Sequence, residues 1–153
     1  PLAVTMASPA IYDAHYSQDR TKQFFHSSSY TANPIACAAA LANLDVWRDE
    51  PVLERVAALA AAQAKGLAMW AEAELENPRQ CGTIIAADFP ASGDAGYLAE
   101  IGPRLKAWFT ERGLLLRPLG NTVYAMPPYC ISAKDLATVH STVADAACEF
   151  LRS

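Results

Sequence analysis

The chain has 153 residues and a formal net charge of −4, from 12 lysines and arginines against 16 aspartates and glutamates. This acidic balance provides no basic field for nucleic-acid phosphates, and no stretch approaches the roughly 18 consecutive apolar residues of a membrane span. The apolar content of 52% argues against disorder, although 31 of those residues are alanine. The length by itself fits one domain.

The first 31 residues predict a short strand, a short helix and a polar loop. Leu2 to Met6 is apolar and partly β-branched, which is typical of a buried strand. Ser8-Pro9 favours a helix start, because serine caps a helix and proline fits its first turn, so we expect a helix over Ala10 to Tyr16. The polar and aromatic residues 17–31 show no periodicity and are expected to form a loop.

Two long helices are expected next. Asn33-Pro34 is a strong helix start, and apolar residues recur at helical spacing from Ile35 through Trp47. The pattern restarts after Pro51 and continues for roughly 25 residues until Asn77-Pro78, which is long for a small domain. The predicted apolar stripe of this second helix consists of Leu53, Val56, Ala60, Ala64, Leu67, Ala71 and Leu75. Because the stripe is mostly alanine, we expect its neighbour to approach closely.

The composition changes after Pro78, and the remaining chain alternates between strands and helices. The Gly120-Asn121 pair tolerates positive φ and predicts a turn, while Ser132, with Asp135 three residues on, resembles a capping box. The predicted elements are a strand at Thr83–Phe89, a helix at Ala95–Arg112, strands at Leu114–Leu116 and Val123–Met126, and a last helix to Leu151. The sequence therefore predicts an α/β protein whose long helices lead into a small β-α-β-β-α domain.

The cysteines indicate a reducing compartment. Cys37, Cys81, Cys130 and Cys148 are widely separated and form no CxxC pair. Zinc sites usually take ligands in close-spaced pairs, and the three histidines supply none, so no metal site is expected. We expect free thiols in a cytoplasmic protein.

Three places could carry chemistry, and each has a simpler structural interpretation. The hydroxyls of residues 26–31 precede a helix start and could cradle a phosphate, or they could form a solvated loop that caps the helix. Arg117 could pair with a carboxylate, or it could be a solvent-facing edge residue. The run Tyr124 to Tyr129 could line a pocket or simply end a strand. In Arg79-x-x-Gly82, the glycine is expected to allow a close backbone approach.

Two runs resemble class III pyridoxal-phosphate-dependent aminotransferases. Residues 26–39 (HSSSYTANPIACAA) resemble the segment that leads from the cofactor loop into a helix in that family. Residues 117–129 (RPLGNTVYAMPPY) resemble the carboxyl-terminal run of the members that act in biotin biosynthesis, and Arg79-x-x-Gly82 matches the start of the family's small domain. The resemblance covers essentially the whole chain. It implies the carboxyl-terminal part of a fold-type I transferase, with residues 1–77 completing the cofactor domain and connecting helices and residues 78–153 forming the small domain.

The resemblance also implies roles for individual residues. Ser28 and Ser29 fall in the loop that holds the phosphate of pyridoxal 5'-phosphate in the neighbouring subunit, which implies a homodimer. Arg117 falls on the arginine that pairs with the carboxylate of the keto-acid substrate, and Tyr124 falls near the same pocket. The implied substrates are S-adenosylmethionine as amino donor and 8-amino-7-oxononanoate as acceptor, with 7,8-diaminononanoate as product.

One departure from the family pattern concerns catalysis. The Schiff-base lysine of the family lies in a Lys-x-x-Thr-Gly-Gly motif, which this sequence lacks. We therefore expect no catalytic residue in this chain, which should be inactive alone. The apolar faces of the first 77 residues should be exposed or paired with another chain. The alternatives are a class III enzyme acting on ω-amino acids and a non-catalytic interaction subunit with the same fold.

Overall fold

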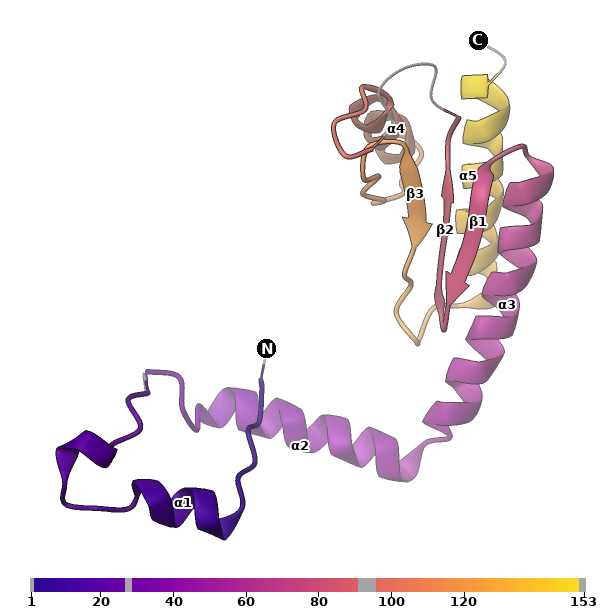
Figure 1. Ribbon diagram of the computed structural model, residues 1–153. Helices are drawn as coiled ribbons and strands as arrows, with labels where there is room; N and C mark the ends of the chain where they lie inside the picture. Colours follow the sequence, from indigo (N-terminus) through magenta and orange to yellow (C-terminus); the bar gives the residue numbers. More distant parts are fainter. Residues whose placement is uncertain (1, 27–28, 91–95, 152–153) are drawn as a thin grey trace. The chain divides into compact units, whose positions relative to one another are not determined.

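The structure is a computed structural model that describes residues 2–26, 29–90 and 96–151. The chain divides into two compact units, Pro1–Pro51 and Val52–Ser153, each of which is described by itself (Figure 1). Within the described residues, no helix combines the length and the hydropathy that a membrane span requires. The expected boundary between residues 77 and 78 concerns the intact enzyme and stays a prediction.

The first unit contains three helical segments, α1 (Pro9–His15), the 3-10 helix η1 (Arg20–Lys22) and α2 (Pro34–Asp49). The helices expected after Ser8-Pro9 and Asn33-Pro34 are therefore confirmed. The strand expected at Leu2–Met6 is wrong, because residues 2–8 have no regular secondary structure. A strand needs a neighbour to satisfy its backbone groups, and this unit offers none among its described residues.

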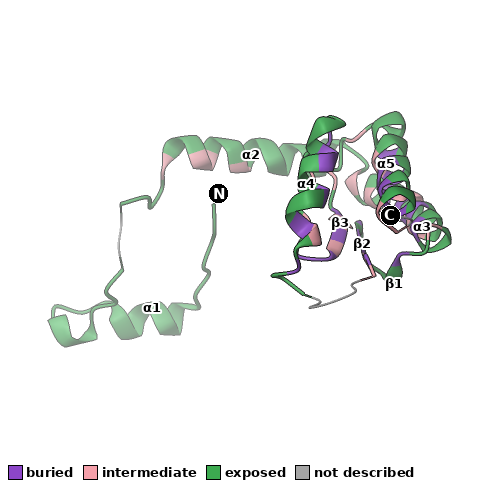
Figure 2. Cartoon of the chain, turned by 90° about the horizontal axis from the view of Figure 1, so that it is seen from above, coloured by how far each residue is buried: buried purple, intermediate pink, exposed green. Residues whose placement is uncertain are grey.

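The described residues of the first unit include no buried side chain (Figure 2). Large apolar side chains of α2 are exposed, namely Ile35, Leu41, Leu44, Val46 and Trp47. The exposure of apolar faces expected for the first 77 residues is therefore confirmed for residues 2–26 and 29–51. It is wrong for α3 (Val52–Glu72), whose Leu59 and Trp70 are buried within the second unit. All four cysteines of the chain are free thiols.

The second unit holds a three-stranded antiparallel sheet in the order β1-β2-β3. Its elements are α3 (Val52–Glu72), β1 (Glu76–Cys81), β2 (Ile84–Asp88), α4 (Ile101–Glu111), β3 (Thr122–Ala125) and α5 (Ala133–Leu151). The helices α3 and α5 lie side by side over one face of the sheet, and α4 packs against α5 (Figure 1). Alternate strand residues enter the core between these layers, among them Ile85, Ala87, Val123 and Ala125. The predicted α/β class is confirmed.

The buried face of α3 differs from the predicted stripe. Leu59, Gln63, Gly66 and Trp70 are its buried residues, and none of them belongs to the predicted set. Alanines occur on all faces of α3, so the apolar periodicity could not distinguish one face from its neighbour. The large Trp70 side chain marks the face that enters the core. The helix also ends earlier than predicted, at Glu72.

A C-terminal cap explains that early end. Glu74 adopts a φ of 65°, and the amide of Leu75 donates to the carbonyl of Trp70 at 3.2 Å, while the Glu74 amide donates to Ala71 at 3.1 Å. This pair of hydrogen bonds is the Schellman motif, which terminates helices at a left-handed residue.

Strand β1 was not predicted, because Asn77-Pro78 indicated only a helix stop. Proline is tolerated here because β1 lies at the edge of the sheet, and the register shifts between Glu76 and Arg79. Gly82 follows β1 with a φ of 57°, yet a Cβ there would meet no atom within 4 Å. The positive φ, not a close backbone approach, therefore explains this glycine.

Two further boundaries differ from the predictions. Residues 114–116 form no strand, and α4 begins at Ile101 rather than near Ala95, which lies outside the described residues. The small domain therefore runs β-β-α-β-α instead of β-α-β-β-α. The predicted cap at Ser132 is confirmed, because its hydroxyl accepts from the Asp135 amide at 3.0 Å. The Asp135 carboxylate accepts from that hydroxyl at 2.7 Å, instead of from the Ser132 backbone amide as in a full capping box.

Candidate active site

The predicted phosphate loop forms a turn directly before α2. Ser29 lies in this turn and is exposed, while Ser28 lies outside the described residues. Asn33 caps the helix, since its Oδ1 accepts hydrogen bonds from the amides of Ile35 at 3.0 Å and Ala36 at 3.1 Å. The hydroxyl of Ser29 makes no hydrogen bond to any residue that the structure describes. Asn33 therefore satisfies two of the amides at the start of α2. The exposed Ser29 hydroxyl lies in the turn before this positive helix end and is a group that suits a phosphate.

Arg117 and Tyr124 lie on the two facing segments of one hairpin. The turn is closed by Leu119 and Thr122, whose backbone groups exchange hydrogen bonds of 2.9 and 3.1 Å. Arg117 lies two residues before this isolated bridge and Tyr124 two residues after it, so the turn joins the segments that carry them. Arg117 is exposed, and Tyr124 is half-buried in β3. The bridge at Leu119 and Thr122 is the only pairing between these two segments among the described residues, and whether the two side chains form one site stays a prediction.

A groove of about 410 Å³ lies on the helix side of this region. Residues of both hairpin segments and of α5 line it, namely Leu114, Leu115, Leu116, Ala125, Met126, Pro127, Asp135, Thr138 and Val139. Residues 114–116 form no strand because they pair with no strand that the structure describes.

Tyr124 belongs to the sheet face opposite to the helices. Its backbone pairs with Ala86, which pairs in turn with Arg79, so the three residues form one row across the sheet. Residues in one such row project from the same face. Arg79 and Tyr124 are therefore both presented on this outer face, where a polar network lies beside them.

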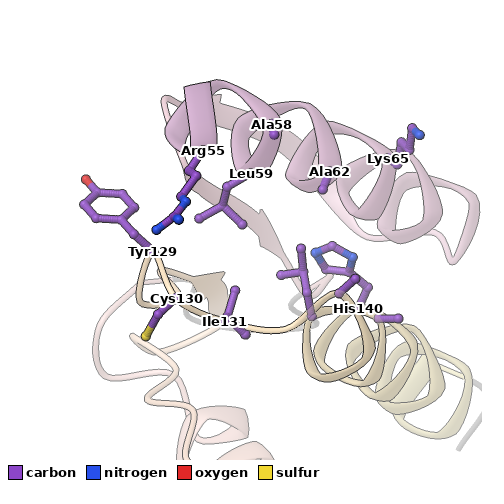
Figure 3. Close-up of a pocket in the computed structure, with 12 residues that line it drawn as sticks. Arg55, Ala58, Leu59, Ala62, Lys65, Tyr129, Cys130, Ile131 and His140 are labelled. Carbon is purple, nitrogen blue, oxygen red and sulfur yellow. The ribbon is translucent and has the colours of Figure 1, made fainter. Parts of the chain in front are cut away.

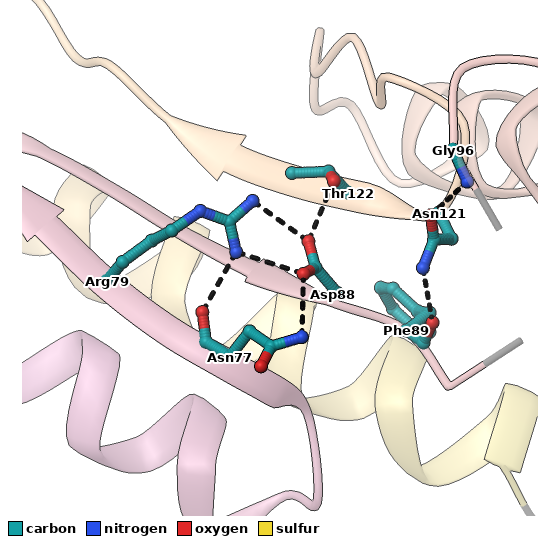
Figure 4. Close-up of polar contacts among 7 residues, drawn as sticks. All are labelled: Asn77, Arg79, Asp88, Phe89, Gly96, Asn121 and Thr122. Carbon is teal, nitrogen blue, oxygen red and sulfur yellow. Dashed lines mark hydrogen bonds and ion pairs between the residues drawn. The ribbon is translucent and has the colours of Figure 1, made fainter.

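The outer polar network is centred on Asp88 (Figure 4). Its carboxylate accepts hydrogen bonds from Arg79 at 2.9 and 3.1 Å, from the Thr122 hydroxyl at 2.7 Å and from the Asn77 amide at 3.2 Å. Burial alone would raise the pKa of the Asp88 carboxyl, but the hydrogen bonds from these three residues and the charge of Arg79 outweigh it and lower the pKa. The network ties all three strands together beside Tyr124.

Asn121 fixes the turn of the hairpin. Its side-chain amide donates to the Phe89 carbonyl at 2.9 Å, and its Oδ1 accepts from the Gly96 amide at 3.0 Å (Figure 4). The predicted turn at Gly120-Asn121 is confirmed, and of this pair Gly120 has the positive φ, at 62°. A Cβ on Gly120 would lie 1.6 Å from the Gly96 carbonyl oxygen, so this position requires glycine for both reasons.

A second groove, of about 650 Å³, opens between α3 and α5 (Figure 3). Lys65 and Tyr129 lie at its rim, and the ring of His140 lies between the two helices, 6% exposed. The His140 Nε2 atom is 2.7 Å from the Oε1 atom of Gln63, which is fully buried. Burial lowers the pKa of His140, which favours its neutral form.

Several of these residues were missed by sequence reasoning. Asp88 escaped notice because its partner Arg79 is on an unpredicted strand. Gln63 and His140 escaped notice because they lie 77 positions apart. A usable signal exists for Gln63, since Leu59, Gly66 and Trp70 surround it at helical spacing.

Comparisons with known proteins identify the family of this chain. Residues 1–147 match the family model of class III aminotransferases. The adenosylmethionine-8-amino-7-oxononanoate aminotransferase of Synechococcus elongatus is 41% identical over 146 residues, which are 95% of this chain and 34% of that protein. The mitochondrial gamma aminobutyrate transaminase 1 of Solanum lycopersicum is 26% identical over 142 residues, covering 89% of this chain and 28% of that protein.

Solved structures share the fold. The adenosylmethionine-8-amino-7-oxononanoate aminotransferase of Methanocaldococcus jannaschii superposes with a TM-score of 0.77 at 24% identity, covering 90% of this chain and 33% of that one. The omega transaminase of Pseudomonas jessenii gives a TM-score of 0.71 at 21% identity, covering 85% and 30%. The chain spans about a third of the length of the curated relatives it matches. With a family model that matches nearly all of its residues, this chain belongs to the class III aminotransferases.

Proposed function

We propose that this chain is the carboxyl-terminal part of a pyridoxal-phosphate-dependent aminotransferase of biotin biosynthesis. The intact enzyme would transfer an amino group from S-adenosylmethionine to 8-amino-7-oxononanoate and release 7,8-diaminononanoate. The observation that carries the proposal is the run 117–129, whose turn at Leu119 and Thr122 joins the segments of Arg117 and Tyr124. Relatives at 41%, 32% and 35% identity that are named for this reaction support it.

The hairpin offers the chemistry that a keto acid with an apolar chain requires. The planar guanidinium of Arg117 can form two parallel hydrogen bonds with a carboxylate. The half-buried Tyr124, on the facing segment, can contact the chain of the same substrate.

The loop before α2 offers groups that fit the cofactor's phosphate. We assign Ser29, and Ser28 beside it, to the phosphate of pyridoxal 5'-phosphate in a partner subunit, which makes the intact enzyme a homodimer. The exposed Ser29 hydroxyl and the positive end of α2 carry this assignment. When bound, the cofactor accepts the amino group from the donor and passes it to the acceptor. The intact enzyme is expected to act in the cytoplasm.

The function can be tested on the full-length enzyme that contains this chain. Formation of 7,8-diaminononanoate from S-adenosylmethionine and 8-amino-7-oxononanoate is expected. Arg117→Ala should raise KM for the keto acid by roughly 100-fold, as expected for loss of a charged hydrogen-bonded pair. Glu111→Ala, an exposed control on α4, should not change KM. A full-length enzyme that makes no 7,8-diaminononanoate would refute the substrate assignment.

A second candidate function is transamination of ω-amino acids, which the relative named gamma aminobutyrate transaminase 1 favours. A screen of amino donors on the same enzyme distinguishes the two: ω-amino acids as the sole effective donors would support this alternative. The 153-residue chain alone should release no product with any donor, because it lacks the family's lysine motif. Complete inactivity of the full-length protein, with a stable partner enzyme bound, would instead indicate a non-catalytic subunit.

A further inference from the structure

A buried amide connects three elements of the second unit near the hairpin of residues 117–124, which we call the substrate hairpin. The Nε2 atom of Gln63, on α3, donates to the carbonyl of Thr83 at 2.8 Å and to the carbonyl of Ala125 at 3.3 Å. Its Oε1 atom is 2.7 Å from Nε2 of His140 on α5. Thr83 lies in the turn between β1 and β2, and Ala125 is the last residue of β3. One side chain therefore holds two ends of the sheet against two helices.

The hydrogen-bond inventory fixes the orientation of both side chains. Two carbonyl oxygens accept from Gln63, so its NH₂ group must face them and its Oε1 must face His140. An amide oxygen is only an acceptor, and therefore His140 must carry its proton on Nε2. Trp70 also holds the turn of α5 that carries His140, because its indole Nε1 donates to the His140 backbone carbonyl at 3.1 Å.

The carbonyl that Gln63 holds follows Tyr124 directly in the chain. Ala125 is buried and Tyr124 projects from the opposite face of the sheet, because successive strand residues alternate. After Ala125 the chain leaves the ladder and lines the groove of the hairpin. The hydrogen bond from Gln63 thus fixes the backbone at the end of β3, directly after Tyr124.

We propose that Gln63 and His140 are positioning residues for the substrate hairpin, acting through the Ala125 carbonyl on the placement of Tyr124. This inference rests on the proposed function of the hairpin and adds the residues that hold it in place. Neither residue touches the substrate. Neutral His140 donates to Gln63 and holds its amide turned toward the sheet, and Gln63 donates to the strand end.

The test compares two substitutions in the full-length enzyme. Gln63→Met nearly preserves volume but removes both donors to the sheet, and Gln63→Asn, which withdraws the amide by one methylene, serves if the first variant does not fold. Gln80→Met is the matched control, because it also removes two hydrogen bonds of a glutamine amide, to the carbonyls of Ala60 and Gly82, and neither partner lies on β3 or α5. For Gln63→Met we expect KM for the keto acid to rise about fivefold, as for one lost hydrogen bond, with kcat changed less than about twofold. Gln80→Met should leave KM unchanged.

Amide hydrogen exchange gives a second readout that needs no turnover. Exchange at residues 122–126 should become about fivefold faster in Gln63→Met and remain as in the wild type in Gln80→Met. Equal exchange and equal KM in the two variants would overturn the positioning role. Absence of product in the wild type would refute only the proposed function, since the exchange comparison would still decide the role of Gln63.

Discussion

Gly66→Ala offers a sharp test of the packing between α3 and α5. Gly66 is buried in the middle of α3, and a Cβ there would lie 2.4 Å from three atoms of the His140 ring. Two effects oppose each other. Alanine improves helix propensity over glycine by about 1 kcal/mol, whereas overpacking a core costs about 1–3 kcal/mol.

The clash should outweigh the propensity, because the ring cannot move without disturbing the His140–Gln63 hydrogen bond. The lost bond leaves buried polar atoms without partners, which costs a further 1–3 kcal/mol or so. We expect Gly66→Ala to lower the free energy of unfolding by about 3 kcal/mol, the balance of these three contributions.

Urea unfolding followed by circular dichroism measures this change, and a double-mutant cycle identifies its cause. In a His140→Ala background the ring is absent, so Gly66→Ala should become stabilising by up to about 1 kcal/mol. Ala68→Gly, at an exposed position of α3, controls for propensity and should cost about 1 kcal/mol in both backgrounds. If Gly66→Ala destabilises equally with and without the His140 ring, the assigned contact is wrong.

Three further predictions concern the polar contacts of the second unit. Because the pKa of Asp88 is lowered in the folded protein, its ionised carboxylate adds to the free energy of unfolding at neutral pH, and this stabilisation is lost as the pH falls below the ordinary value of 3.8. In urea titrations Asp88→Asn should lower the free energy of unfolding by about 1 kcal/mol at pH 7 and by less at pH 3. The lowered pKa of His140 makes the unfolded state bind the proton more strongly, so stability should fall as the pH drops below 6.5, and His140→Gln should abolish that part of the pH dependence. Asn121→Ala should lower the free energy of unfolding by about 2 kcal/mol, because Phe89 and Gly96 lose their partner, whereas the exposed Ser141→Ala should change it by less than about 0.5 kcal/mol; equal values for the two variants would contradict the role of Asn121.

Sequence patterns alone located the helices whose starts have local chemistry. Asn33-Pro34 and the pair Ser132 and Asp135 satisfy helix amides with groups only a few residues away, so their caps can be predicted without a fold. The turn at Gly120 is equally local, because its positive φ depends on the residue itself. The family resemblance also came from contiguous runs, and the family comparison confirmed it.

Tertiary structure decided the features that depend on distant partners. Strand β1 exists because β2 lies beside it, although Pro78 argued against a strand locally. Residues 114–116 form none because they pair with no strand that the structure describes. The buried face of α3 depends on where Trp70 and Gln63 find partners, and an alanine-rich helix carries little information about that choice. Hydrogen bonds from Gln63 to Ala125, and from His140 to Gln63, span 62 and 77 positions. Local sequence determines backbone preference and caps, whereas only the folded chain determines which buried polar groups meet.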